Sequence, residues 1–142
     1  MKKIVFAVML VLVLALSACG GGGETGGSDS ATVDVPAEYA GKTNPLAGDA
    51  AAAEAGADVY ATNCASCHGD AGAGDGPAGS ALDPKPAALN NLGADKSDAY
   101  LFWRISEGGM MEPYNSSMPA FKGVLSEEQI WQTIAFIHTL GQ

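Results

Sequence analysis

The stretch Cys64-Ala65-Ser66-Cys67-His68 decides the interpretation of this chain. Its two thiols stand three positions apart, so that each can add across one vinyl group of a porphyrin. The histidine that follows is then placed over the face of the ring, where it can take one axial position on the iron. The spacing C-x-x-C-H occurs once in the sequence and predicts one haem c, attached covalently through Cys64 and Cys67, with His68 as an iron ligand.

Other uses of these residues fit the sequence less well. A structural zinc site needs four ligands, and the chain has one further cysteine, Cys19, and one further histidine, His138. A thioredoxin-like redox pair needs a βαβ context, and no run of β-branched residues surrounds the motif. A plain disulfide between the two thiols would leave His68 without a role.

The first eighteen residues have the form of an export signal. The chain begins with a positive segment, continues with thirteen apolar residues (4–16) and places small residues before Cys19. The apolar run is too short to span a bilayer as a permanent helix. Its ending, Leu16-Ser17-Ala18-Cys19, resembles the lipobox of bacterial lipoproteins. We therefore expect lipidation of Cys19 and anchoring at the outer face of the cytoplasmic membrane. The alternative is an ordinary secretory signal that leaves Cys19 as a free thiol.

The exported chain would be strongly acidic. The whole sequence has a formal net charge of −9, and removal of residues 1–18 takes away two lysines and leaves −11. Nucleic acid is excluded as a partner, because phosphate binding needs clustered Lys and Arg. We expect partners with a basic docking face, since complementary charge speeds encounter and fixes orientation. Plain solubility is the alternative explanation.

Residues 19–47 are expected to form a flexible tether behind the lipid. Residues 20–27 are mostly glycine, and the rest of the segment has no helical periodicity and few apolar side chains to offset the cost of ordering. Its second part, residues 33–46, is also compatible with lying along a partner surface. The folded domain is then residues 48–142, which is too small for two cores and gains apolar surface from a buried haem.

Three helices are predicted in this domain, and no strand. Asp49 can cap an alanine-rich helix over residues 50–63, which leads into the haem motif. A middle helix begins at Ser97 or Asp98 and ends at the glycine pair that starts with Gly108.

The last helix has the strongest signal. Residues 126–129, Ser-Glu-Glu-Gln, have the pattern of a capping box, apolar residues follow at helical spacing, and Gly141 is the expected stop. The predicted fold is all-α, with three to five helices and long loops wrapped around the haem.

The candidates for the second axial ligand are Met110, Met111 and Met118. Met118 precedes Pro119, which cannot continue a helix and helps to hold an extended loop against the ring. We choose Met118, with Met111 next; the alternative for any methionine is core or loop filler. His138 would need the last helix to turn a different face inward, and a histidine is favourably placed near a helix C-terminus in any case.

These features resemble the class I c-type cytochromes over residues 48–142. Gly56 and Tyr60 resemble the Gly-x-x-x-aromatic pattern of the N-terminal helix of that family, in which the glycine admits close crossing by the last helix. The family's ligand methionine sits on a loop before the C-terminal helix, as Met118 does here.

The resemblance also implies two kinds of haem contact outside the axial ligands. A proline after the motif offers its backbone carbonyl to the Nδ1–H of the haem histidine, which orients the ring. Pro86 is our choice and Pro84 the alternative. Arg104 and Trp103 are candidates for contacts with the haem propionates, and the alternatives are a surface arginine and a packed tryptophan.

Histidine and methionine together give a six-coordinate iron without a vacant position, which suits one-electron transfer rather than dioxygen binding. We therefore expect a lipid-anchored electron carrier that is not an enzyme. Its arrangement also resembles the monohaem subunit of alternative complex III, which would imply delivery of quinol electrons to a terminal oxidase or a photosynthetic reaction centre. The alternatives are a haem sensor or peroxidase-like domain with a labile sixth ligand, and a scaffold lipoprotein with a structural haem.

Overall fold

The structure is a computed structural model that describes residues 35–141. Residues 1–34, which include the predicted signal and Cys19, lie outside the described part. The described part contains five helices: α1 (Ala50–Asn63), α2 (Ala65–His68), α3 (Leu89–Asp95), α4 (Asp98–Glu107) and α5 (Glu127–Ile137). Within it there is no β-strand, only an isolated bridge between Lys122 and Leu125. No helix in this range is long and apolar enough to cross a membrane.

The cap of α1 confirms the predicted start of that helix. The carboxylate of Asp49 accepts hydrogen bonds from the backbone N–H groups of Ala51 and Ala52, at 2.9 and 3.2 Å. Two of the four unpartnered N–H groups at the helix start are thereby satisfied. The helix ends at Asn63, and Cys64 links it to the short helix α2. The haem motif is therefore held on a continuation of α1.

The capping box of α5 is also confirmed. The N–H of Gln129 donates to the Ser126 hydroxyl at 3.1 Å, and the Ser126 N–H donates to the Gln129 side chain at 2.9 Å. The helix ends at Ile137, one turn before the predicted stop at Gly141. The intervening residues form tight turns, in which the N–H of Leu140 donates to the carbonyl of Ile137 at 3.1 Å.

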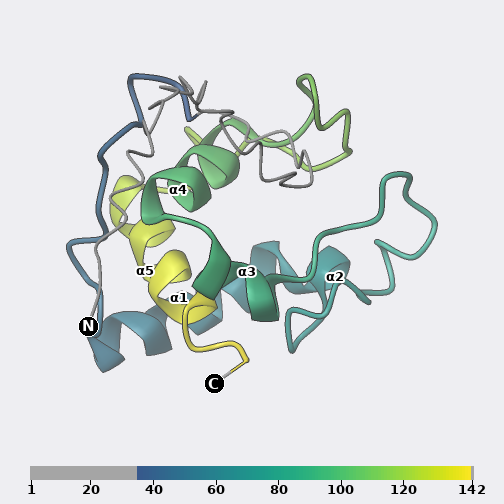
Figure 1. The fold of residues 1–142 in the computed structure, drawn as a ribbon. Coiled ribbons are helices and arrows are strands. Elements are labelled where there is room, and N and C mark those ends of the chain that lie inside the picture. Colours follow the sequence, from purple (N-terminus) through teal and green to yellow (C-terminus); the bar gives the residue numbers. More distant parts are fainter. Residues whose placement is uncertain (1–34, 142) are drawn as a thin grey trace, which may run out of the picture. The chain divides into compact units, whose positions relative to one another are not determined.

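The first and the last of the three predicted helices, α1 and α5, cross in direct contact (Figure 1). At Gly56 a Cβ atom would lie 1.9 Å from the backbone carbonyl oxygen of Gln132, so only glycine allows this approach. One turn later the rings of Tyr60 and Phe136 pack at 5.1 Å between centroids. The close crossing expected from the Gly56 and Tyr60 pattern is confirmed.

The middle helix α4 packs on α5 and completes the core. Ser97 caps it through a bond from the N–H of Tyr100 at 3.2 Å, and it ends at Glu107, directly before Gly108, where φ is +73°. The rings of Phe102 and Trp131 lie 4.3 Å apart between centroids. Sequence patterns did not predict α3, which has no side-chain cap at its start.

Residues 35–47, which we call the strap, pack against the helices, so the predicted domain start at residue 48 is too late. Tyr39 is 5% exposed and belongs to the core. The side-chain amide of Asn44 donates to the carbonyl of Trp131 at 2.9 Å, and its backbone N–H donates to the carboxylate of Asp98 at 2.9 Å. The strap has few apolar residues and could not form a core of its own, but these residues pack onto the core that the helices form.

Candidate functional site

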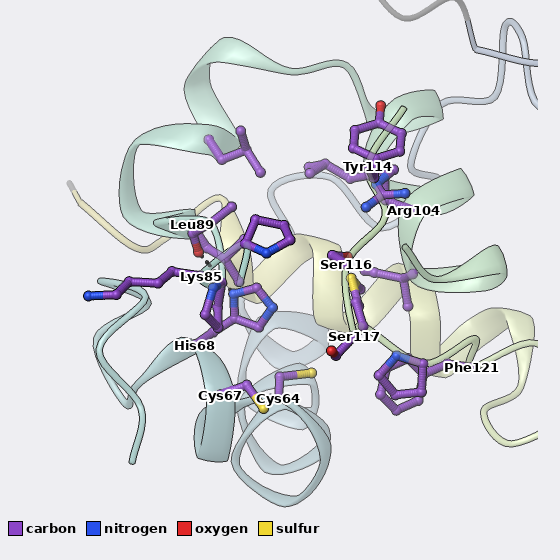
Figure 2. A pocket seen from close by; sticks show the side chains of 18 of the residues that line it. Cys64, Cys67, His68, Lys85, Leu89, Arg104, Tyr114, Ser116, Ser117 and Phe121 are labelled. Carbon is purple, nitrogen blue, oxygen red and sulfur yellow. Dashed lines mark hydrogen bonds between the residues drawn. The ribbon is translucent and has the colours of Figure 1, made fainter. Parts of the chain in front are cut away.

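A cavity of about 440 Å³ lies between α2, α4, α5 and the loops around them. The five residues predicted to attach the haem, to ligate its iron or to orient its histidine all line this one cavity: Cys64, Cys67, His68, Pro86 and Met118. In Figure 2 Cys67 and His68 lie on one side of the space, and Ser116 and Phe121 lie on the other. The volume is within the range of about 300–1,000 Å³ that is typical of sites for small molecules and cofactors.

The imidazole of His68 is oriented by a backbone carbonyl, but not by the predicted one. Its Nδ1 lies 2.9 Å from the carbonyl oxygen of Ala87. The carbonyl of Pro86 points elsewhere, since its oxygen lies 2.6 Å from where a Cβ on Gly74 would be. The choices of Pro86 and Pro84 as acceptors are therefore wrong, although the predicted kind of contact is present one residue later.

This contact also fixes the protonation of His68. A carbonyl oxygen can only accept, so the proton resides on Nδ1 and the lone pair of Nε2 is left for a metal. Burial lowers the pKa of His68, although the bond to Ala87 opposes that shift. The neutral form, which is the one that binds metal, therefore prevails at neutral pH.

Of the two thiols beside it, Cys64 lies where its surroundings disfavour the thiolate. Burial, with the neighbouring Cys67 as a smaller cause, raises the pKa of Cys64 to about 11. A thiol with this pKa stays protonated near neutral pH and is a poor thiolate ligand or nucleophile. Both cysteines are free, and no group of three or more His, Cys, Asp or Glu side chains within residues 35–141 could hold a metal ion.

Tyr60 ties the motif to α1, a contact that the sequence did not reveal. Its hydroxyl donates to the carbonyl of Gly69 at 2.7 Å, directly after His68. Burial raises the pKa of Tyr60 to about 12, so the hydroxyl remains a donor at all ordinary pH values. The end of α2 is thus fixed from the helix that precedes it.

The cavity wall is apolar, with few polar groups. No aspartate or glutamate lines it, and its only charged side chains are those of Lys85 and Arg104. The apolar lining comes mainly from leucine, isoleucine and aromatic residues: Leu82, Leu89, Leu92, Leu101, Ile105, Phe121 and Ile137. Such a wall fits a large planar apolar group such as haem, because few polar side chains would lose water when it binds.

Met118 reaches the cavity from the loop between α4 and α5. Its carbonyl accepts the N–H of Gly109 at 2.9 Å, and the loop returns to α4 where the N–H of Phe121 donates to the carbonyl of Ile105 at 3.0 Å. Of the three candidate methionines, Met118 lines the cavity. Met110 is 71% exposed, and Met111 packs against the core without lining the cavity.

The remaining candidates separate into core and cavity residues. Trp103 is buried and packs edge-on against Tyr114, at 5.9 Å between centroids, without lining the cavity. Arg104 does line it. His138 lies away from the cavity wall, with Nε2 at 2.8 Å from a carboxylate oxygen of Asp98.

Comparison with known proteins places the chain in a family. The family described as cytochrome C oxidase, cbb3-type, subunit III matches residues 51–137. The cbb3-type cytochrome c oxidase subunit CcoP of Azospirillum brasilense is 36% identical over 107 residues, which cover 74% of this chain and 34% of that protein. Cytochrome c6 of Leptolyngbya boryana is 34% identical over 85 residues, which cover 60% of this chain and 88% of that protein. The chain thus spans about a third of the oxidase subunits that it matches.

Solved structures support the fold. A chain of the reducing HAO-like protein complex of Kuenenia stuttgartiensis aligns with a TM-score of 0.56 and 27% identity, over 69% of this chain and 47% of that one. Cytochrome CL of Methylophaga aminisulfidivorans aligns with a TM-score of 0.53 and 24% identity, over 68% and 60%, which shows the fold alone. The chain belongs to the family of cytochrome c oxidase, cbb3-type, subunit III, and it is an all-α class I c-type cytochrome.

Proposed function

We propose that this chain is a membrane-tethered carrier of single electrons, with one haem bound through thioethers to Cys64 and Cys67 and with His68 and Met118 as axial ligands. The observation that carries the proposal is that these four side chains, which come from two distant parts of the sequence, line one apolar cavity. A haem ligated by histidine and methionine supplies a reversible one-electron couple of raised potential.

The residues of the chain have three tasks in this proposal. The carbonyl of Ala87 orients the His68 ring and increases its basicity as a ligand. The loop before α5 presents Met118 to the same cavity. The apolar wall excludes water, which limits solvent reorganisation when the charge of the site changes.

We further propose that the chain is exported, cleaved after Ala18 and lipidated at Cys19, which would keep it at the outer face of the cytoplasmic membrane. The form of the first nineteen residues supports this, as does the need of c-type cytochromes for attachment of haem outside the cytoplasm. Its partners would be membrane redox complexes, such as a quinol-oxidising complex as donor and a terminal oxidase or reaction centre as acceptor. The names of the matched oxidase subunits support a partner of this class. The resemblance to the monohaem subunit of alternative complex III remains a prediction.

The test is to express the full chain in a host that matures c-type cytochromes and to compare it with Met118→Ala. We expect mass spectrometry to show one added tetrapyrrole, and the ferric protein to show a sulfur-to-iron charge-transfer band that Met118→Ala lacks. Met111→Ala is the control and should keep the band.

The competing function makes opposite predictions for the unmodified protein. A haem sensor or peroxidase-like domain would lack the charge-transfer band and would bind carbon monoxide readily when reduced. Absence of any added tetrapyrrole would contradict both functions.

A further inference from the structure

The loop that carries Met118 doubles back on itself directly after α4. The N–H of Gly109 donates to the carbonyl of Met118 at 2.9 Å, and the N–H of Ser116 donates to the carbonyl of Gly109 at 2.8 Å. At Gly108 a Cβ would lie 2.6 Å from the same Met118 carbonyl. The two ends of this loop are therefore in contact, so a shift of Gly108 or Gly109 would also move the backbone of Met118.

Arg104 contacts this loop at two points from the last turn of α4. Its Nη1 donates to the carbonyl of Gly108 at 2.6 Å. Its guanidinium carbon lies 3.5 Å from the centroid of the Tyr114 ring, near the tip of the loop. Tyr114 is packed on another side by Trp103, so the ring that receives the guanidinium is itself fixed in place. Arg104 thus joins the base of the loop to its tip (Figure 2).

No carboxylate engages Arg104 in the part of the chain that the structure describes. None of the ion pairs formed there includes it, and no acidic side chain lines the cavity beside it. Its partners are a carbonyl and two aromatic rings, Tyr114 at 3.5 Å and Trp103 at 5.8 Å. A partly buried guanidinium in such surroundings is suited to holding backbone in place, since its planar fork can donate and stack at the same time. A lysine has neither the fork nor the plane.

We propose that Arg104 is a positioning residue that holds the 108–118 loop and so keeps Met118 on the iron, an inference that rests on the proposed ligation by Met118. A rival role is purely electrostatic, in which Arg104 acts only as a positive charge in the cavity wall. Lys85 provides the comparison, because it also lines the cavity but lies near Pro86 and Ala87, on the His68 side.

The test uses the full haem-loaded protein with Arg104→Ala, Arg104→Lys and the control Lys85→Ala. The affinity of the ferric form for added imidazole, which competes with Met118, measures how easily the loop is released. We expect Arg104→Ala to raise that affinity at least about tenfold, because a charge-assisted hydrogen bond and a cation–π contact are lost together. Arg104→Lys should also raise it, while Lys85→Ala should leave it within about twofold of the original.

Tyr114 gives an independent test if the arginine variants fold poorly. Tyr114→Leu removes the ring under the guanidinium and should raise imidazole affinity, whereas Tyr114→Phe keeps the ring and should not. The proposal is overturned if Arg104→Lys matches the unmodified protein while Arg104→Ala and Lys85→Ala shift alike, since charge alone would then explain the data.

A second readout separates this inference from the ligation on which it rests. Amide hydrogen exchange at Gly109 and Ser116 reports the loop whether or not Met118 binds the iron. One outcome is that the unmodified protein lacks the charge-transfer band and that exchange at these amides is faster in Arg104→Ala. This would contradict the ligation by Met118 but support the role of Arg104 in holding the loop. Unchanged exchange, with the band intact in every variant, would sink only the role of Arg104.

Discussion

The hydrogen bond that orients His68 comes from a backbone carbonyl, and the identity of a side chain does not specify which carbonyl that is. Pro86 and Ala87 are neighbours, and the path of the loop turns the carbonyl of Ala87 toward the imidazole and that of Pro86 toward Gly74. A proline near the motif predicts that such a bond exists. Only the path of the chain determines the acceptor.

Gly74→Ala tests this path at the scale of one residue. The new Cβ would lie 2.6 Å from the Pro86 oxygen, at a φ of +78° that already disfavours alanine. We expect a loss of about 2–4 kcal/mol in the free energy of unfolding, from backbone strain and a clash together. Denaturant unfolding measures the loss, and the NMR signal of the His68 Nδ1–H should shift as the acceptor moves.

Gly48→Ala is the matched control for that substitution. Its φ is +77°, but no atom lies within 4 Å of the new Cβ, so it isolates the conformational strain of about 1 kcal/mol. Equal losses at the two glycines would show that the contact with Pro86 does not constrain the loop.

At the scale of elements, the crossing of α1 and α5 fixes the haem motif relative to the end of the chain. α1 runs directly into α2 and its motif, while Thr133 and Ile137 of α5 line the cavity. A change in the crossing would therefore move two walls of the cavity relative to one another. Gly56 does not line the cavity, but it determines how closely α1 and α5 approach and hence how the two cavity walls are placed.

Gly56→Ala should destabilise the protein although alanine is the better helix former. Helix propensity favours alanine by about 1 kcal/mol, but its Cβ would lie 1.9 Å from the backbone oxygen of Gln132, which cannot rotate away. We expect a net loss of about 3 kcal/mol or more, seen as a lower melting temperature and weaker haem retention.

Gly93→Ala, in α3, is the control for this prediction. There the nearest atom to the new Cβ is the carbonyl oxygen of Ile137 at 3.1 Å, so a small shift relieves the contact and the loss should be under about 1 kcal/mol. A stabilising effect of Gly56→Ala would mean that the helices are not in close contact at this point.

At the scale of the whole described domain, the strap determines where the folded unit begins. Its residues bond to both ends of α4: Asn44 to Asp98 at the start, and the hydroxyl of Tyr39 to Glu107 at the end. Between these two ends, α4 lines the cavity through Leu101 and, in its last turn, through Arg104 and Ile105. The strap therefore supports one cavity wall from outside.

Asn44→Ala tests whether the strap is part of the fold. The carbonyl of Trp131 would lose its side-chain donor but keep its partner within α5, and the half-buried N–H of Leu46 would lose its acceptor. Each lost hydrogen bond costs about 0.5–1.5 kcal/mol, so we expect a clear fall in unfolding free energy. Glu38→Ala, at an exposed position of the same segment, should change it by no more than about 0.5 kcal/mol. If the segment is only a tether, the two variants will behave alike.

The sequence alone was sufficient for the features that depend on local chemistry. The spacing of Cys64, Cys67 and His68 is a covalent requirement, and the caps at Asp49, Ser97 and Ser126 act within one helical turn. These signals are complete within a few neighbouring residues, so the haem motif, three helices and the all-α class could be predicted without a structure.

Tertiary structure decided the features that depend on where distant backbone runs. Three contacts are of this kind: the bond from His68 to the carbonyl of Ala87, the packing of the strap, and the contacts of Arg104 with the loop that carries Met118. Each either joins segments that are separate in the sequence or uses a backbone group. Every residue carries a backbone carbonyl, and every residue except proline carries an N–H, so composition and periodicity cannot distinguish them. The path of the folded chain selects which of them meet.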